Sequence, residues 1–182
     1  MEFIPTKIPG CWEIAPDVRG DERGFFVKTF HEPTFAAKGL AVHYAEEFYS
    51  LSKRGVLRGL HFHAPPRAHA KLVHCPEGEI LDAVVDLRRG SPAFGSHVLL
   101  EIDSKKRNMI YIPEGLAHGF CVRSAEALVV YKTTTPYSPE HDAGIRWDSA
   151  GIRWPDPSPI VSDRDGRFPA LAGFESPFTY RP

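Results

Sequence analysis

Histidine is the residue type with the widest chemical scope in this chain, which contains nine histidines among 182 residues. His61 and His63 lie two positions apart in a strand-like run, and alternation along a strand places both side chains on the same face. His118 follows a strand-and-turn signal and can meet them if that face lines a cavity. Imidazoles grouped in this way act as acid–base catalysts near neutral pH or as ligands of a transition metal.

The metal interpretation rests on two short patterns that resemble the metal motifs of the cupin superfamily. The first is the His61–His63 pair after Gly55, and the second is the segment 113–118, which reads Pro-x-Gly-x-x-His. Three histidines with open coordination positions suit a catalytic metal. However, the segment 64–70 lacks the acidic ligand that cupins usually carry after the histidine pair. The sequence therefore favours acid–base work without a metal. A metal-dependent cupin oxygenase or isomerase, or histidines with no shared role, remain as alternatives.

Short strands must position these side chains, because 17 prolines and 15 glycines interrupt the chain throughout. A polar turn is expected at 19–22, and a short helix at 32–38 with Pro33 in its first turn and Gly39 at its end. The expected strands are 23–30, 42–52, 55–63, 70–74, 79–87, 97–102, 109–112, 119–122 and 128–134. About ten strands in a single domain (residues 1–182) indicate an all-β sandwich or barrel such as a jelly roll.

The composition and charge exclude several classes of protein. Lysine plus arginine number 22 and aspartate plus glutamate 23, so the net charge is −1, which argues against a nucleic-acid binder. No apolar run approaches the roughly 20 residues of a membrane helix, and the N-terminus does not resemble a signal peptide. Three widely spaced cysteines fit reduced thiols better than a disulfide framework. We therefore expect a cytoplasmic protein that binds neither nucleic acid nor a membrane.

Several short segments carry a more specific signal because they occur together and in one order. They are DERGFF at 21–26, VLRGLHF at 56–62, AKLV at 70–73, VDLRRGSP at 85–92, IPEGLAHGF at 112–120 and SDRD at 162–165. From about residue 3 to about residue 168, the chain resembles the dTDP-4-dehydrorhamnose 3,5-epimerase family. The resemblance implies a cupin-type jelly roll with a few short helices, a homodimer, and no metal or organic cofactor. It also implies inversion of stereocentres beside the C4 ketone of a nucleotide-linked 4-keto-6-deoxyhexose, in deoxysugar biosynthesis.

Epimerisation beside a ketone needs a base at the carbon, a cation at the enolate oxygen and an acid on the opposite face. By resemblance, His61 is the base and Asp165 is the carboxylate that orients it, although Asp165 lies in a loop-like run. Lys71 matches the residue that holds the enolate oxygen, since an ammonium acts as a point charge. Tyr131 matches the acid, and His118 matches a motif position near the base.

The nucleoside diphosphate of such a substrate requires arginine, whose planar guanidinium fits phosphate oxygens. Arg23 and Arg58 match phosphate contacts of the family, and Phe26 and Tyr137 match aromatic contacts to the nucleotide base. Arg58 and His61 have opposite parity, so an ideal strand would aim them at opposite faces. Either Gly59 hosts a bulge that turns the chain, or Arg58 reaches the site of a neighbouring subunit. The strand around Arg23 is a candidate for pairing with that second subunit.

Four positions depart from the pattern of the family. Lys28 stands where the family usually has Glu near the nucleotide base, and His63 stands where it usually has Gln. Glu46 and Phe48 replace Gln and Asn near the sugar. Lys28 offers only donors, which suit cytosine better than thymine, so the sequence also suggests a CDP sugar. Phe48 indicates a different sugar or a single inverted centre.

Three related activities therefore stay open within the leading hypothesis: a 3,5-epimerase, a 3-epimerase and a ketoisomerase. They share the first proton abstraction and differ in where the proton returns. A non-catalytic sugar-binding cupin is a further alternative of a different class.

Overall fold

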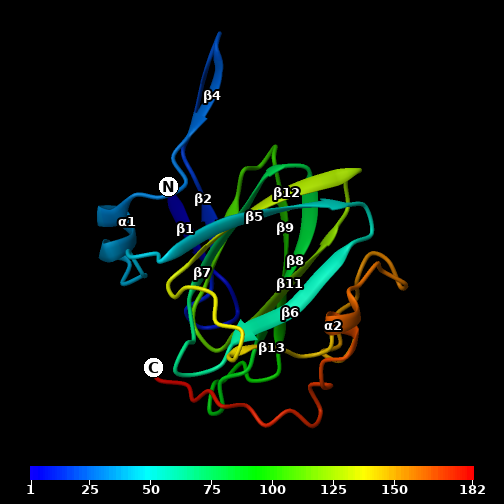
Figure 1. The fold of residues 1–182 in the computed structure, drawn as a ribbon. Helices are drawn as coiled ribbons and strands as arrows, with labels where there is room; N and C mark the ends of the chain where they lie inside the picture. Colours follow the sequence, from blue (N-terminus) through cyan, green and yellow to red (C-terminus); the bar gives the residue numbers. More distant parts are fainter.

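Two antiparallel sheets form the body of the molecule, whose computed structural model describes residues 1–182. The six-stranded sheet contains, in spatial order, β1 (Glu2–Pro5), β2 (Trp12–Ala15), β10 (Met109–Ile112), β7 (Lys71–Glu77), β12 (Glu126–Thr133) and β5 (Glu46–Lys53). The five-stranded sheet contains β13 (Asp142–Gly144), β6 (Leu57–His63), β11 (Leu116–Val122), β8 (Glu79–Asp86) and β9 (His97–Asp103). Figure 1 shows the two sheets facing each other with the crossing connections of a jelly roll.

Alternation of side chains explains why the sheets pack in this way. In β12, the inward residues Ala127, Val129, Tyr131 and Thr133 are buried, whereas the residues between them are partly exposed. Every residue of β11 is buried, because the five-stranded sheet is covered on both faces. One core cluster fills the space between the sheets, and a second covers the outer face with side chains from the C-terminal segment, including Ile145 and Phe178.

The structure confirms the all-β jelly roll and the main strand predictions. The run expected at 109–112 is β10, the run expected at 79–87 is β8, and the expected helix at 32–38 is α1 (Glu32–Ala37). The polar turn predicted at 19–22 is wrong, because Val18–Asp21 forms β3, which pairs with β4 (Gly24–Val27). Polar and glycine residues dominate β3, so its sequence has no apolar alternation to mark it as a strand.

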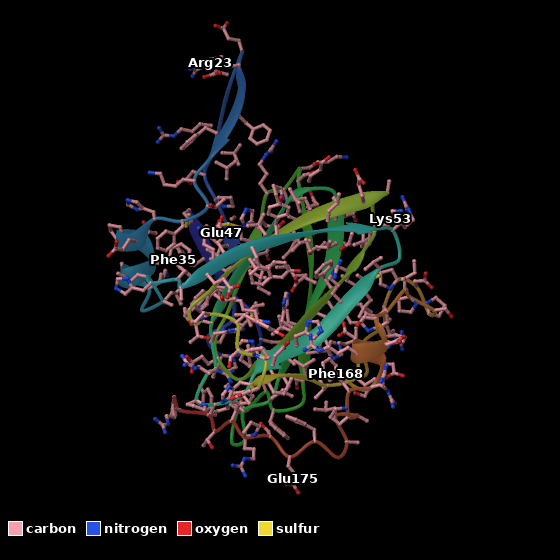
Figure 2. All side chains as sticks on the ribbon, viewed as in Figure 1. Arg23, Phe35, Glu47, Lys53, Phe168 and Glu175 are labelled. Carbon is pink, nitrogen blue, oxygen red and sulfur yellow. The ribbon has the colours of Figure 1, made fainter.

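The β3–β4 hairpin projects away from the sandwich (Figure 1). Its residues are almost all exposed, and Phe25 and Phe26 each leave 61% of their surface accessible. The guanidinium of Arg107 lies 3.9 Å from the centre of the Phe25 ring, which ties the outer half of the hairpin to the body. The tip, with Arg23, extends beyond this contact (Figure 2).

Two other features concern the cysteines and the helices. Cys11, Cys75 and Cys121 are free thiols, and all three are buried. The two helices, α1 and α2 (Asp163–Gly166), have six and four residues, so neither could cross a bilayer.

Candidate active site

A cavity of about 360 Å³ opens between the two sheets, a size that falls within the usual range for small-molecule sites. Side chains from both sheets line it. From the predicted set these are Glu46, Phe48, Arg58, His61, His63, Lys71, His118, Tyr131 and Tyr137. The structure therefore brings most of the predicted residues together in one place.

His61 and Asp165 form a hydrogen-bonded pair at this cavity. Asp165 Oδ1 lies 2.8 Å from His61 Nε2, and Asp165 Oδ2 accepts a hydrogen bond from the Gly59 backbone N–H at 3.0 Å. With Nε2 bonded to the carboxylate, Nδ1 is the ring nitrogen left to accept a proton. This geometry is that of an imidazole base held in one tautomer by a carboxylate.

The short helix α2 presents Asp165, so the loop-like run expected there is wrong. Ser162 caps this helix by accepting a hydrogen bond from the Asp165 backbone N–H, and Asp165 is buried. Burial alone would raise the pKa of Asp165, but the hydrogen bonds and charge from His61 and the Gly59 amide lower it below its usual value. Asp165 therefore stays ionised behind the ring and can stabilise an imidazolium.

A break in strand register at Gly59 explains why Arg58 and His61 face the same cavity although they have opposite parity in the strand. Opposite the three-residue step from Arg58 to His61, the partner strand β11 advances only two residues, from Phe120 to His118. Gly59 has a φ of 140°, and an added Cβ would lie 2.6 Å from Gly119 Cα. The irregularity turns both Arg58 and His61 toward the cavity.

Lys71 is a buried cation at the start of β7. Its Nζ donates a hydrogen bond to the His61 carbonyl oxygen at 3.2 Å, so the ammonium lies beside the base. Burial lowers the pKa of Lys71 to about 8, although the nearby charges of Asp142 and Asp82 act in the opposite direction. The side chain is charged at neutral pH and has few other partners, which suits it to binding a developing enolate oxygen.

The pH dependence of kcat should reflect the loss of the proton from Lys71. The ammonium is present below its pKa and is lost as pH rises, so kcat should fall as the pH rises through about 8. Tyr131 does not contribute to this decline, because burial raises its phenol pKa well above the usual value. In Lys71→Arg the alkaline decline should disappear while the rate at neutral pH falls. An unchanged decline in this variant would remove Lys71 from the mechanism.

His118 is held by a second buried carboxylate. Its Nε2 lies 2.7 Å from Asp82 Oδ2, and both residues are almost fully buried beneath the cavity. Burial lowers the pKa of His118 despite the opposing effect of Asp82. A neutral His118 with a fixed ring is therefore suited to a polar contact with a substrate and poorly suited to proton transfer.

The three histidines considered as metal ligands do not converge. His61 Nε2 bonds to Asp165 and His118 Nε2 bonds to Asp82, whereas His63 packs against His69 with ring centres 4.3 Å apart. No three His, Cys, Asp or Glu side chains are grouped so that they could hold a metal ion. The arrangement of donors thus gives no support to the metal-dependent alternative.

Three predicted residues lie outside the cavity. Arg23, Phe26 and Lys28 belong to the projecting hairpin or follow it directly, and Arg23 pairs with Asp21 at the exposed tip (Figure 2). Phe26 and Lys28 line a separate surface hollow with Arg19 and His31. Within one chain they do not line the cavity that His61 lines.

The structure also shows cavity residues that the sequence analysis missed. Asp142 lies directly opposite His63 across β13 and β6, and Arg164 bonds to Asp142 at 2.7 Å. Two cavity residues that were predicted are linked to each other, because Glu46 accepts a hydrogen bond from the Tyr137 backbone N–H at 2.6 Å and so holds the loop that carries Tyr137. Arg164 immediately precedes Asp165 in the SDRD segment. That segment was the one feature of the sequence that pointed to Arg164. Asp142 had no such feature, because its strand of three residues is too short to be recognised.

Comparisons with known proteins identify the family of the chain. A sequence model of the family described as dTDP-4-dehydrorhamnose 3,5-epimerase matches residues 5–173. A dTDP-4-dehydrorhamnose 3,5-epimerase of Shigella flexneri is 45% identical over 168 residues, which cover 91% of this chain and 93% of that protein. A dTDP-4-dehydrorhamnose 3-epimerase of Streptomyces niveus is 40% identical, with 91% and 81% of the two chains covered.

A solved structure extends the agreement to three dimensions. The dTDP-6-deoxy-D-glucose-3,5-epimerase of Legionella pneumophila, in complex with dTDP-4-keto-L-rhamnose, superposes with a TM-score of 0.93 at 34% identity. The match covers 100% of this chain and 99% of that one. The fold and the site define a cupin-type isomerase that acts on a sugar nucleotide. The chain belongs to the dTDP-4-dehydrorhamnose 3,5-epimerase family.

Proposed function

We propose that this enzyme inverts C3 and C5 of a dTDP-linked 4-keto-6-deoxyhexose through an enolate, in the biosynthesis of a rhamnose-type sugar. The observation that carries the proposal is the placement of an imidazole–carboxylate pair and a phenol on opposite sheets of one cavity. His61 comes from β6 in the five-stranded sheet, and Tyr131 comes from β12 in the six-stranded sheet. A sugar ring bound between the sheets presents one face to each group, as inversion requires.

The proton transfers balance in two steps. His61 Nδ1 takes the proton from the carbon beside the ketone, and the electrons of the broken C–H bond form the enolate. Asp165 stabilises the imidazolium, and the Lys71 ammonium stabilises the negative charge on the enolate oxygen. Tyr131 then donates its phenolic proton to the opposite face of the same carbon. Solvent removes the proton from His61 and restores that of Tyr131.

We propose that the functional form is a homodimer in which the β3–β4 hairpin serves the site of the second subunit. The proposal is supported by the exposure of Phe25 and Phe26 and by the absence of Arg23, which is exposed, from the lining of the cavity of its own chain. Arg23 and Phe26 would then contact the diphosphate and the nucleotide base of a substrate bound to the partner, with Arg58 and Tyr137 on the other side.

Subunit complementation tests this arrangement. Arg23→Ala and His61→Ala homodimers should each have little activity. After random exchange of subunits, half of the dimers are mixed, and each mixed dimer has one site with both native residues. The mixture should therefore regain about a quarter of the wild-type rate. No recovery, with mixed dimers demonstrated by native mass spectrometry, would show that the hairpin does not act on a partner.

Lys28 matches a family position near the nucleotide base, so it concerns which nucleotide the enzyme binds. The relatives are named for dTDP sugars, so we expect dTDP to bind more tightly than CDP, UDP or GDP. Isothermal titration of the four nucleotides measures this preference directly. A clear preference for CDP would instead support the donor role of Lys28 toward cytosine and would replace the dTDP sugar in the proposal.

The cytoplasmic location stays a prediction, based on the three free thiols.

A further inference from the structure

Phe48 lies directly against the phenol ring of Tyr131. The two residues are opposite each other in the register of β5 and β12, so their side chains project from the same face of the six-stranded sheet. Their rings are stacked, with centres 4.8 Å apart and planes inclined by 14°. Both line the cavity.

The exposures of the two rings show which one covers the other. Tyr131 leaves only 8% of its surface accessible, whereas Phe48 leaves 44%. β5 is the edge strand of its sheet, and Figure 1 shows it running across the front of the sandwich beside β12. Phe48 is therefore the outer ring and separates one face of the phenol from solvent.

The other neighbours of Tyr131 cannot replace this contact. His118 meets the phenol edge-on at 6.2 Å between ring centres, and Phe120 lies at 6.4 Å. Neither covers the flat face that Phe48 covers. Without Phe48, that face would meet water, and the ring would gain freedom to turn about its side-chain bonds.

We propose that Phe48 is a positioning residue that holds the Tyr131 phenol where its proton reaches the face of the enolate opposite His61. The inference rests on the proposed function, because it assigns Tyr131 the final proton transfer. The enolate can be protonated on either face, by Tyr131 or by His61. If Tyr131 donates its proton, the centre is inverted and a phenolate is left for solvent to reprotonate. If His61 returns a proton from its own side, the original centre is restored.

This division can be measured in heavy water, where the Tyr131 hydroxyl carries solvent deuterium and the proton that His61 has taken can exchange for deuterium. Inversion places deuterium in the product, whereas return from His61 after that exchange places deuterium in recovered substrate. For Phe48→Ala the total exchange is measured at saturating substrate, because Phe48 also lines the cavity. The ratio of inverted product to deuterated substrate should fall about three- to tenfold, the equivalent of one lost ring stack. Phe48→Tyr retains a flat ring and should restore the wild-type ratio.

Two further variants distinguish the positioning of Tyr131 from a general effect of the substitution on the structure. Phe48→Leu retains apolar bulk without a flat face, so it should also lower the ratio, and it serves if the alanine variant does not fold. Leu51→Ala changes an exposed residue on the other face of the same strand and should leave the ratio unchanged. If Phe48→Ala and Phe48→Leu lower both protonations equally or leave the ratio unchanged, Phe48 does not position the acid. If wild type exchanges no deuterium into a dTDP-4-keto-6-deoxyhexose, the proposed function itself is wrong, and the role of Phe48 falls with it.

Discussion

Replacing His61 with alanine should abolish deuterium exchange at both carbons beside the ketone. The imidazole is the group that removes the proton, and its tautomer is held by Asp165 at 2.8 Å. A positioned general base contributes about 10²- to 10⁴-fold to the rate, so we expect a loss of that size in both exchange and turnover. Because the step is blocked before the enolate forms, deuterium should appear neither in product nor in recovered substrate.

A matched variant separates this effect from general damage to the protein. His43 is also a histidine, but it is exposed and does not line the catalytic cavity. His43→Ala should therefore retain wild-type exchange, and both variants should bind dTDP as wild type does. Exchange by His61→Ala at the wild-type rate would assign the base to another residue.

Tyr131→Phe should separate the two proton transfers. This variant keeps the ring, its stacking on Phe48 and its burial, and it removes only the donor. His61 and Lys71 remain, so the enolate should still form, and deuterium should enter recovered substrate within a fewfold of the wild-type total. Formation of inverted product should fall about 10²- to 10³-fold, because no acid remains on the opposite face.

The control for Tyr131→Phe is the same change at Tyr49. Tyr49 lies on β5 but is 72% exposed and does not line the cavity, so Tyr49→Phe should retain both exchange and inversion. If Tyr131→Phe still forms inverted product at a rate near that of wild type, another group is the acid. Loss of exchange and inversion to the same extent would instead indicate that the phenol acts before the enolate forms.

The fold could be predicted from the sequence where a run of apolar, strand-forming residues lies between clear turns. The runs that became β8, β10 and β12 have both features. The hairpin strand Val18–Asp21 has neither, and its pairing with Gly24–Val27 is stabilised by contacts such as that of Arg107 with Phe25. Local propensity contains no information about such a distant partner.

The candidate site could be predicted in its residue types but only partly in its geometry. The resemblance named His61 and Asp165, and the structure places them in contact. The stacking of Phe48 on Tyr131 depends on the register of β5 against β12, which the order of residues along the chain does not reveal. Asp142 could not be predicted because its strand of three residues is too short to be recognised, and it becomes significant only opposite His63.

The most direct test of the enolate mechanism is the position of solvent deuterium in the product. Wild-type enzyme is supplied with a dTDP-4-keto-6-deoxyhexose in heavy water, and the inverted product is examined by proton NMR and mass spectrometry. We predict one solvent deuterium at each inverted carbon and none at the remaining ring carbons. Inverted product that retains its original hydrogen at those carbons would show that the centres are inverted without the proton abstraction assigned to His61.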